Sequence, residues 1–249
     1  MDAITFMEQV YEELGDESVD LFLVDFPYTY KGKNRVTANK WDLPVNLERF
    51  FDLAMKILTE KGAIVLTATN PFASYLVSNF TEHFKYEWIW EKDNGSNFTH
   101  VKYQPFKVHE QVLVFGKSAT TYVKSGKNML YNPQMTEGKP YKVNRKGMTD
   151  NLAASNGYER TSGEYEGVRY PRSVQKFNME KGLHPTQKPV SLFEYIIKTY
   201  TNENDLVVDC CTGSGTTAVA SKNTNRRYIV NDIEFDYYKV TKDRLNKII

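Results

Sequence analysis

The fold class is indicated by one short stretch, Val19-Asp20-Leu21-Phe22-Leu23-Val24-Asp25-Phe26-Pro27-Tyr28. Its apolar first part contains β-branched and aromatic residues and is typical of a buried strand, which ends at Pro27 because proline has no N–H to donate to a sheet ladder. Asp25 and Tyr28 are therefore expected at the carboxyl end of a strand, the edge of an open α/β sheet at which ligands bind. On these residues alone, a polar turn beside a packed aromatic ring is an equally good interpretation.

Helices and strands are predicted to alternate along most of the chain. Helices are expected over 3–14, 45–60, 70–84, 190–199, 215–222 and 237–248, and further strands over 63–68, 86–90, 111–115, 205–208 and 228–230. Gly15 and Gly62 are expected to end the first two helices. This alternation predicts an α/β, Rossmann-like domain with a mostly parallel twisted sheet and helices on both faces.

The segment 117–182 interrupts the alternation. It has little hydrophobic periodicity, contains six tyrosines, and carries 12 Lys and Arg against 6 Asp and Glu, although the whole chain has a net charge of only +1. Basic residues neutralise phosphates and aromatic rings stack on bases, so this composition is typical of a nucleic-acid surface, while a solvated insertion that folds on itself is the alternative. The predicted division is one domain in two halves, 1–116 and 183–249, with 117–182 inserted; we call this segment the target-recognition insertion.

Composition limits the setting of the chain. Its two cysteines, Cys210 and Cys211, are adjacent and cannot join distant segments, which favours a reducing cytoplasm. No run approaches the roughly 20 apolar residues of a membrane span, and the first ten residues lack the apolar core of a signal peptide. The four histidines are scattered and no Cys-x-x-Cys spacing occurs, so no metal site is expected.

A glycine-rich turn follows the strand expected at 205–208. It reads Asp209-Cys210-Cys211-Thr212-Gly213-Ser214-Gly215-Thr216-Thr217 and leads into a helix, so backbone N–H groups at the helix start would face a ligand. Gly213, Gly215 and Ala218 fit the loose dinucleotide fingerprint, and Asp232 lies where a carboxylate would bind ribose hydroxyls. The charge of Asp209 would repel a pyrophosphate and favour the cationic S-adenosylmethionine. A nicotinamide-dependent oxidoreductase is the alternative.

Three motifs together resemble those of the beta class of DNA amino-methyltransferases. Asp25-Phe26-Pro27-Tyr28 is similar to the catalytic Asp-Pro-Pro-Tyr of that family, the 209–217 turn to its Asp-Pro-Phe-x-Gly-Ser-Gly-Thr-Thr, and 184–189 to its His-Pro-Thr-x-Lys-Pro. The order of the motifs also matches, and the resemblance covers nearly the whole chain. Phe26 replaces a proline of the family pattern, and Cys210 and Cys211 replace a Pro-Phe pair. Phenylalanine keeps the backbone carbonyl but loses the fixed φ of proline.

The resemblance implies a class I methyltransferase fold in permuted order, with S-adenosylmethionine as cofactor. It implies methyl transfer to the exocyclic amine of a flipped adenine in a specific sequence of double-stranded DNA. Asp25 and the Phe26 carbonyl would accept the amine hydrogens, and Tyr28 would stack on the base. N4-cytosine is the alternative target, and Phe26 motivates a second alternative, a DNA-binding protein without methylation activity. A homodimer and a cognate restriction endonuclease are further expected partners.

The expected site residues follow from these motifs. The expected catalytic residues are Asp25, Phe26, Pro27 and Tyr28. Residues expected to bind the cofactor are Asp2, Asp25, His184, Thr186, Lys188, Asp209, Cys210, Cys211, Thr212, Gly213, Ser214, Gly215, Thr216, Thr217 and Asp232. Residues expected to bind DNA are Lys31, Lys33, Arg35, Lys40, Lys139, Lys142, Arg145, Lys146, Arg169 and Arg172, the first four from a polar basic loop after the first strand and the others from the target-recognition insertion.

Overall fold

The computed structural model describes residues 1–29, 44–121, 123–124, 126–143, 163–183 and 186–248. The chain divides into two compact units. The larger unit comprises Met1–Asn132 and Ser173–Ile249, and the smaller one Pro133–Arg172.

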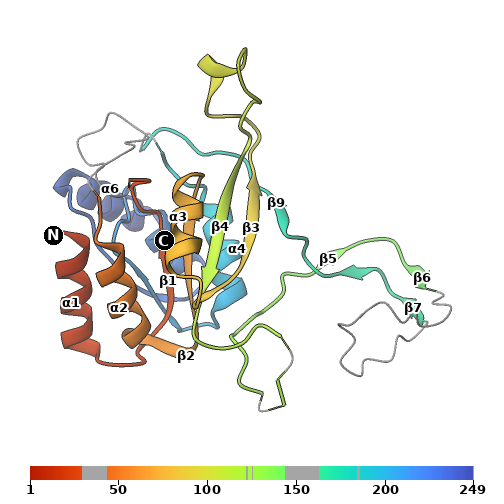
Figure 1. The fold of residues 1–249 in the computed structure, drawn as a ribbon, viewed down its shortest axis with the longest axis horizontal. Helices are drawn as coiled ribbons and strands as arrows, with labels where there is room; N and C mark the ends of the chain where they lie inside the picture. The colour runs from red at the N-terminus through yellow and green to blue at the C-terminus, as the bar shows by residue number, and fades with distance from the viewer. Residues whose placement is uncertain (30–43, 122, 125, 144–162, 184–185, 249) are drawn as a thin grey trace. The chain divides into compact units, whose positions relative to one another are not determined.

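The larger unit is built on a sheet of the order β11-β10-β1-β2-β4-β3-β9. Figure 1 labels five of these strands, β1, β2, β3, β4 and β9. The strands that run parallel to their neighbours in one half are β1 (Val19–Val24), β2 (Leu58–Ala68), β10 (Leu206–Asp209) and β11 (Arg227–Val230). In the other half β4 (His109–Phe115) is antiparallel to β2 and to β3 (Phe84–Glu91), while β9 (Val174–Lys176) is parallel to β3. Four of these six pairings are parallel, as predicted.

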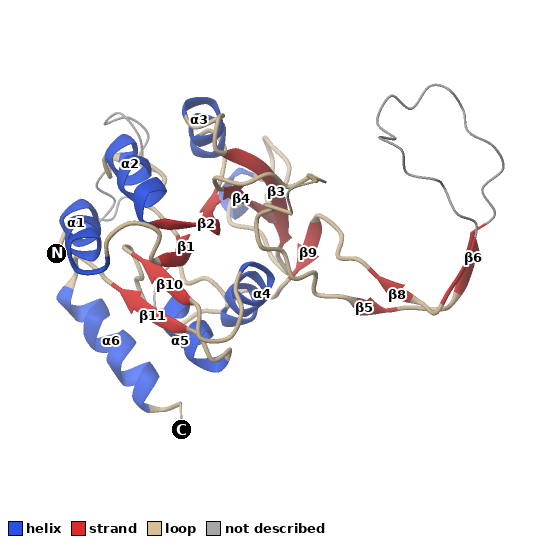
Figure 2. Ribbon diagram, turned by 90° about the horizontal axis from the view of Figure 1, so that it is seen from below, coloured by secondary structure: helices blue, strands red, loops and turns tan. Residues whose placement is uncertain are grey.

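Helices cover both faces of this sheet (Figure 2). One face packs against α1 (Ala3–Leu14), α2 (Leu47–Ile57) and α3 (Phe72–Asn79), and the other against α4 (Val190–Tyr200) and α5 (Thr216–Asn223). The last helix, α6 (Phe235–Asn246), contacts α5. In β1, Phe22 and Val24 enter the first core and Leu21 and Leu23 the second, which explains why this strand is apolar almost throughout.

Two expectations about local structure were wrong. The helix predicted over 45–60 ends at Ile57, and Gly62 does not end it but lies within β2. A Cβ at Gly62 would come within 2.8 Å of the carbonyl oxygen of Asp20, so glycine allows the close approach of β1 and β2. In addition, the irregular 117–182 segment contains β9, which extends the main sheet.

The smaller unit consists of two short antiparallel pairs. They are β5 (Thr136–Glu137) with β8 (Val168–Arg169), and β6 (Tyr141–Val143) with β7 (Gly163–Tyr165). The rings of Tyr141 and Tyr165 stack with centroids 4.9 Å apart, and the guanidinium of Arg169 lies 4.0 Å from the Tyr141 ring centroid. This unit lies within the segment predicted to be the target-recognition insertion. Across the described residues of both units, no helix has the length and apolar composition needed to cross a bilayer.

Candidate active site

The site forms at one edge of the main sheet, where four strands bring polar residues together. Asp25 follows β1, Thr67 lies near the end of β2, Lys92 follows β3 and Glu110 lies at the start of β4. Because β4 is antiparallel to β2 and β3, the first residues of β4 lie beside the last residues of those strands. Gln111, the residue after Glu110, pairs with Ala68 at the end of β2.

Asp25 is held by three donors and stays partly open. The ammonium of Lys188 donates to Oδ2 at 2.5 Å, and the hydroxyl of Thr67 donates to Oδ1. The Tyr28 hydroxyl lies 3.2 Å from Oδ1 and shares its one hydrogen between Asp25 and Glu110. The Asp25 side chain remains 22% exposed, whereas Lys188 is only 7% exposed. A carboxylate has about four acceptor positions, so a position on Oδ2 is left for a further donor.

Glu110 completes a buried network with Lys92 and Lys188. Its Oε2 accepts from the Tyr28 hydroxyl at 2.9 Å and lies 3.7 Å from the Lys188 ammonium, while Oε1 accepts from Lys92. Burial alone would raise the pKa of Glu110, but the ammonium groups of Lys188 and Lys92 hold it below its ordinary value. Burial alone would lower the pKa of Lys188, and the carboxylates of Asp25 and Glu110 raise it instead. Two carboxylates and two ammonium groups thus balance each other in a largely dry site.

The side chain of Phe26 is part of the core rather than of the site surface. Its ring is buried edge-on against Phe50 of α2, with centroids 4.9 Å apart and planes at 84°. Packing of this ring fixes the backbone at the position where the family pattern has proline. The next residue, Pro27, accepts a hydrogen bond from the Thr29 N–H at 2.7 Å, and the Tyr28 ring stacks on Phe72 with centroids 5.6 Å apart.

A second feature is a hollow of about 570 Å³ beside the glycine-rich turn. Its lining includes Met1, Thr212, Asp232 and Ile233, and its size lies within the range of small-molecule sites. The N–H of Gly213 donates to Asp232 Oδ2 at 2.7 Å, which joins the turn to the end of β11. The hydroxyl of Thr212 is buried and has no hydrogen-bond partner among the described residues, so a polar ligand atom would satisfy it.

Asp209 is buried beneath this turn. Its carboxylate accepts from the Cys211 N–H at 2.9 Å and from the Thr217 hydroxyl. Burial, together with the charges of Asp25 and Asp232, raises the pKa of Asp209 to about 7 despite these bonds. The carboxyl groups of Asp25, Asp209 and Asp232 are thus close enough to interact, and a cationic ligand such as a sulfonium with an ammonium group would stabilise their charged forms.

Other expected cofactor residues hold the turn in place. Gly213 and Gly215 have φ values of 53° and 78°, which favour glycine. The Thr216 hydroxyl donates to the Lys188 carbonyl oxygen at 3.2 Å, so the turn is tied to the segment that carries the buried ammonium. Arg244 of α6 donates to the Ser214 carbonyl oxygen at 2.8 Å.

The remaining expected residues lie at several places. Asp2 caps α1 by accepting from the N–H groups of Ile4 and Thr5, each at 3.1 Å. Cys210 is buried, and Thr186 is exposed. Four expected DNA contacts lie in the smaller unit: Lys139, Lys142, Arg169 and Arg172. Outside the described residues lie His184, Lys31, Lys33, Arg35, Lys40, Arg145 and Lys146.

Thr67, Lys92 and Glu110 were missed at the level of sequence. Thr67 lies within the predicted strand at 63–68, and Lys92 and Glu110 flank two other predicted strands. The parallel pairing of β1 with β2, in which Val24 lies opposite Leu66, brings Thr67 beside Asp25. The antiparallel pairing of β4 with β2 and β3 adds Glu110 and, through it, Lys92. The pair His109-Glu110, directly before the predicted strand at 111–115, was the available signal.

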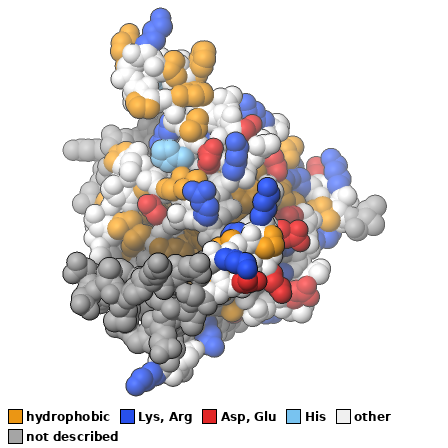
Figure 3. Space-filling view, turned by 90° about the vertical axis from the view of Figure 1, so that its right-hand side faces the viewer, with side chains coloured by type: hydrophobic (Ala, Val, Ile, Leu, Met, Phe, Trp, Pro, Cys, Tyr) orange, Lys and Arg blue, Asp and Glu red, His pale blue; other side chains and the backbone are white. Residues whose placement is uncertain are grey.

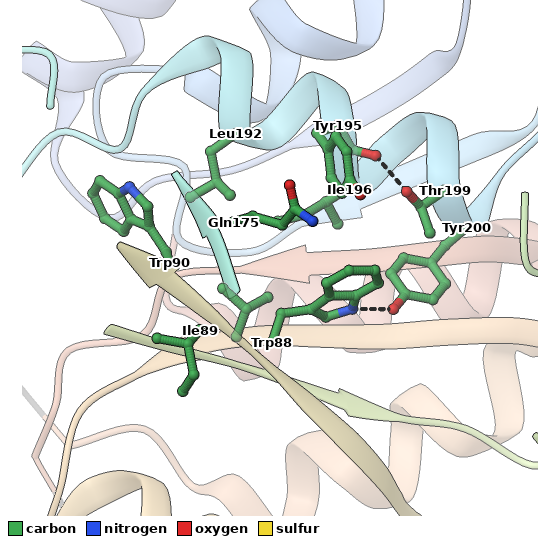
Figure 4. A pocket seen from close by; sticks show the side chains of 10 residues that line it. Trp88, Ile89, Trp90, Gln175, Leu192, Tyr195, Ile196, Thr199 and Tyr200 are labelled. Carbon is green, nitrogen blue, oxygen red and sulfur yellow. Dashed lines mark hydrogen bonds between the residues drawn. The ribbon is translucent and has the colours of Figure 1, made fainter. Parts of the chain in front are cut away.

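A smaller cavity lies elsewhere, between β3 and α4 (Figure 4). It measures about 10 Å³ and is lined mainly by apolar and aromatic side chains, including Trp88, Trp90 and Tyr200. The Trp88 ring N–H donates to the Tyr200 hydroxyl at 2.6 Å. Its size admits no organic ligand, so we interpret it as an imperfection in the packing of the second core.

Comparison with known proteins decides the family. A family model for N6/N4 methyltransferases, described as DNA methylase, matches residues 19–243. The chain belongs to this DNA methylase family. The membership predicted from the three motifs is thus confirmed, and the oxidoreductase alternative is set aside.

Several relatives align with the methylase over most of its length. It is 29% identical to the type II methyltransferase M1.MboII of Moraxella bovis, over 100% of this chain and 95% of the relative. It is 31% identical to the type II methyltransferase M.HpaI of Haemophilus parainfluenzae, over 94% and 70%, and 28% identical to the DNA adenine methyltransferase YhdJ of Escherichia coli (strain K12), over 92% and 77%. A shorter match, 50% identical over 66 residues, covers 26% of the methylase and 24% of the type II methyltransferase M2.LlaDCHI of Lactococcus lactis subsp. cremoris.

Solved structures support the fold. The methylase aligns with the M1.HpyAVI-SAM complex at a TM-score of 0.61 and 24% identity, over 98% of this chain and 96% of that one. It aligns with the cytosine-N4-specific PvuII DNA methyltransferase at a TM-score of 0.67 and 15% identity, over 100% and 86%. The predicted class I methyltransferase fold is thereby confirmed.

Proposed function

We propose that this methylase transfers a methyl group from S-adenosylmethionine to the exocyclic amine of adenine in DNA. The observation that carries the proposal is the partly open Asp25 carboxylate at the sheet edge, fixed by Lys188 and Thr67 in a chain of the DNA methylase family. The hollow lined by Thr212 and Asp232 supplies a place for the cofactor, and the acidic surroundings of Asp209 suit its positive charges.

The chemistry follows from the groups at this edge. An exocyclic amine is a poor nucleophile because its lone pair is delocalised into the ring. When the amine hydrogens are accepted by the Asp25 carboxylate and the Phe26 carbonyl, the nitrogen moves toward tetrahedral geometry and its lone pair becomes available. S-adenosylmethionine, when bound, supplies an electrophilic methyl group. Asp25 holds the hydrogen that the nitrogen gives up, and the buried Lys188 ammonium stabilises the carboxylate in one orientation.

The base must leave the duplex to reach Asp25. An amine inside a stacked duplex is inaccessible, and enzymes that act on it flip the nucleotide out. Tyr28 is the aromatic residue proposed to stack on the flipped base. Its hydroxyl is held by Glu110 and its ring by Phe72, so the ring is already oriented before DNA binds.

Adenine is proposed over cytosine because the motif at Asp25 begins with an acid, the more frequent pattern in adenine-specific members of the family. Cytosine N4 remains the second candidate, since the similar proteins include both the DNA adenine methyltransferase YhdJ and the cytosine-N4-specific PvuII enzyme.

The proposal extends to the partners. Double-stranded DNA would be held by the basic residues of the smaller unit and of the loop after β1. Two chains acting together would enlarge a small DNA-reading surface, and relatives named as type II methyltransferases suggest a cognate restriction endonuclease.

Identification of the product tests the proposed reaction. The purified protein is incubated with S-adenosylmethionine and unmethylated plasmid, and the DNA is digested to nucleosides for mass spectrometry. N6-methyladenine is the expected product. N4-methylcytosine would overturn the choice of base but not the family chemistry, and the absence of both on several DNA sources would favour a protein that binds DNA without methylating it.

A further inference from the structure

The loop between β3 and β4 projects from the same sheet edge as Asp25. It spans residues 93–108 and contains a short 3₁₀ helix, η1 (Phe98–His100). Figure 1 shows it at the top of the larger unit, extending beyond the ends of both strands.

The foot of this loop forms one wall of the catalytic network. The Lys92 N–H donates to the Val108 carbonyl oxygen at 2.7 Å, and the Lys92 ammonium donates to Glu110. On the other side, the Lys107 ammonium donates to the hydroxyl of Thr69, just beyond the end of β2. The loop is thus anchored beside the residues that hold Asp25 and Tyr28.

Hydrogen bonds within the loop give it a defined shape. The Asn97 side chain donates to the Pro105 carbonyl oxygen at 3.0 Å and accepts from the Lys107 N–H at 2.8 Å. Gly95 lies directly under the Phe106 ring, and any side chain there would overlap this ring. The loop therefore presents its tip in a fixed orientation rather than as a free chain.

The tip exposes two aromatic side chains to solvent. Tyr103 is 88% exposed and Phe98 is 77% exposed, the highest values among the large hydrophobic side chains that the structure describes. Figure 3 shows hydrophobic side chains gathered with a basic one on this projection, at the top of the view. Leaving such large apolar surfaces in water is unfavourable, which indicates a surface that is covered when a partner binds.

The charge of the loop favours DNA as that partner. Residues 93–108 contain Lys102, Lys107 and His100 and one acid, Asp93, which lies at the foot of the loop and accepts from the Met179 N–H at 2.7 Å, so the tip from Phe98 onward carries only basic charge. A self-associating apolar surface needs no such excess of positive charge, whereas a surface that approaches phosphates does. Apolar wedges flanked by basic residues are the means by which proteins open base steps.

We propose that Phe98 and Tyr103 enter the duplex beside the flipped base and occupy the space that it leaves. This inference rests on the proposed function and deepens it, because extrusion of a base costs unstacking and unpairing that an inserted ring offsets. The two rings act on the DNA, whereas Asp25 and Tyr28 act on the extruded base.

The test compares the double variant Phe98→Ala/Tyr103→Ala with the parent on two DNA duplexes. One is fully paired, and in the other the target base faces an abasic site, so that no pair needs to be opened. Methylation rate and DNA affinity are measured for both. We expect a loss of about tenfold or more in kcat/KM and in affinity on the paired duplex, and at most about threefold on the abasic duplex. The variant Phe98→Tyr/Tyr103→Phe should retain parental values, and Leu14→Ala, an exposed apolar change on α1, is the matched control.

Equal losses of kcat/KM and affinity on both duplexes, or no loss on either, would contradict the insertion of Phe98 and Tyr103 into the duplex. Light scattering adds a further outcome: conversion of a dimer to a monomer in the double variant, with equal losses, would assign the tip to self-association instead. If the parent binds DNA but transfers no methyl group, the proposed reaction is wrong. The comparison of affinities for the two duplexes then tests the insertion of Phe98 and Tyr103 without the reaction.

Discussion

Glu110 is a positioning residue in this account, because it reaches the reacting base only through Tyr28 and Lys188. Glu110→Gln keeps the size of the side chain but removes the charge that balances two ammonium groups. We expect kcat for DNA methylation to fall by about tenfold or more while the Kd for S-adenosylmethionine, measured by calorimetry, stays within about twofold. Glu91→Gln is the control, since Glu91 forms its one ion pair within the described part of the chain with the exposed Lys176, at 3.8 Å. An equal fall in both variants would contradict the assignment.

Asp209 makes the stability of the protein depend on pH. Its pKa is raised by burial from 3.8 to about 7, so in the native state it keeps a proton that the unfolded chain loses at about pH 4. The stabilisation is full below about pH 4 and is lost as the pH rises through about 7. We expect Tm to fall less over this window in Asp209→Asn than in the parent. Parallel Tm profiles of the two proteins, measured by calorimetry, would show that Asp209 ionises normally.

At the scale of elements, the end of β1 is fixed to α2 by the Phe26 ring. Phe26→Ala would leave a cavity against Phe50 and is expected to lower the free energy of unfolding by about 3–5 kcal/mol in urea titrations. Phe98→Ala removes the same atoms from a residue that is 77% exposed, and it should change the free energy of unfolding by no more than about 0.5 kcal/mol. A Phe26→Ala protein as stable as the Phe98→Ala protein would mean that the ring does not hold the strand end.

The elements also show what sequence could and could not predict. The apolar run before Asp25 and the strand-turn-helix around Gly213 are local patterns, and both were recognised. The contact between Asp25 and Lys188 joins positions 163 residues apart. It was not derivable from periodicity, because hydrophobic patterns indicate which residues are buried but not which strands are neighbours. Glu110 was missed for the same reason. Gly62 was wrongly predicted to end a helix because a glycine that follows a helical pattern resembles a helix cap.

At the scale of the whole molecule, one sheet edge supports both cofactor binding and methyl transfer in the proposed site. The parallel half carries Asp25 and the hollow proposed for the cofactor, and the antiparallel half carries Glu110, Lys92 and the projecting loop. The charge is uneven as well, because the 117–182 segment is strongly basic in a chain that is nearly neutral. Binding of the cofactor and transfer of its methyl group should therefore be separable by mutation.

The most direct test of the account is transfer of a tritium-labelled methyl group from S-adenosylmethionine to unmethylated DNA by the parent and by Asp25→Ala, with cofactor binding measured in both. Asp25 is not part of the hollow lining, so binding should persist within about tenfold, while transfer should fall by at least about a thousandfold. Labelled DNA produced by Asp25→Ala at a rate close to that of the parent would contradict the central claim that this carboxylate at the sheet edge carries the reaction.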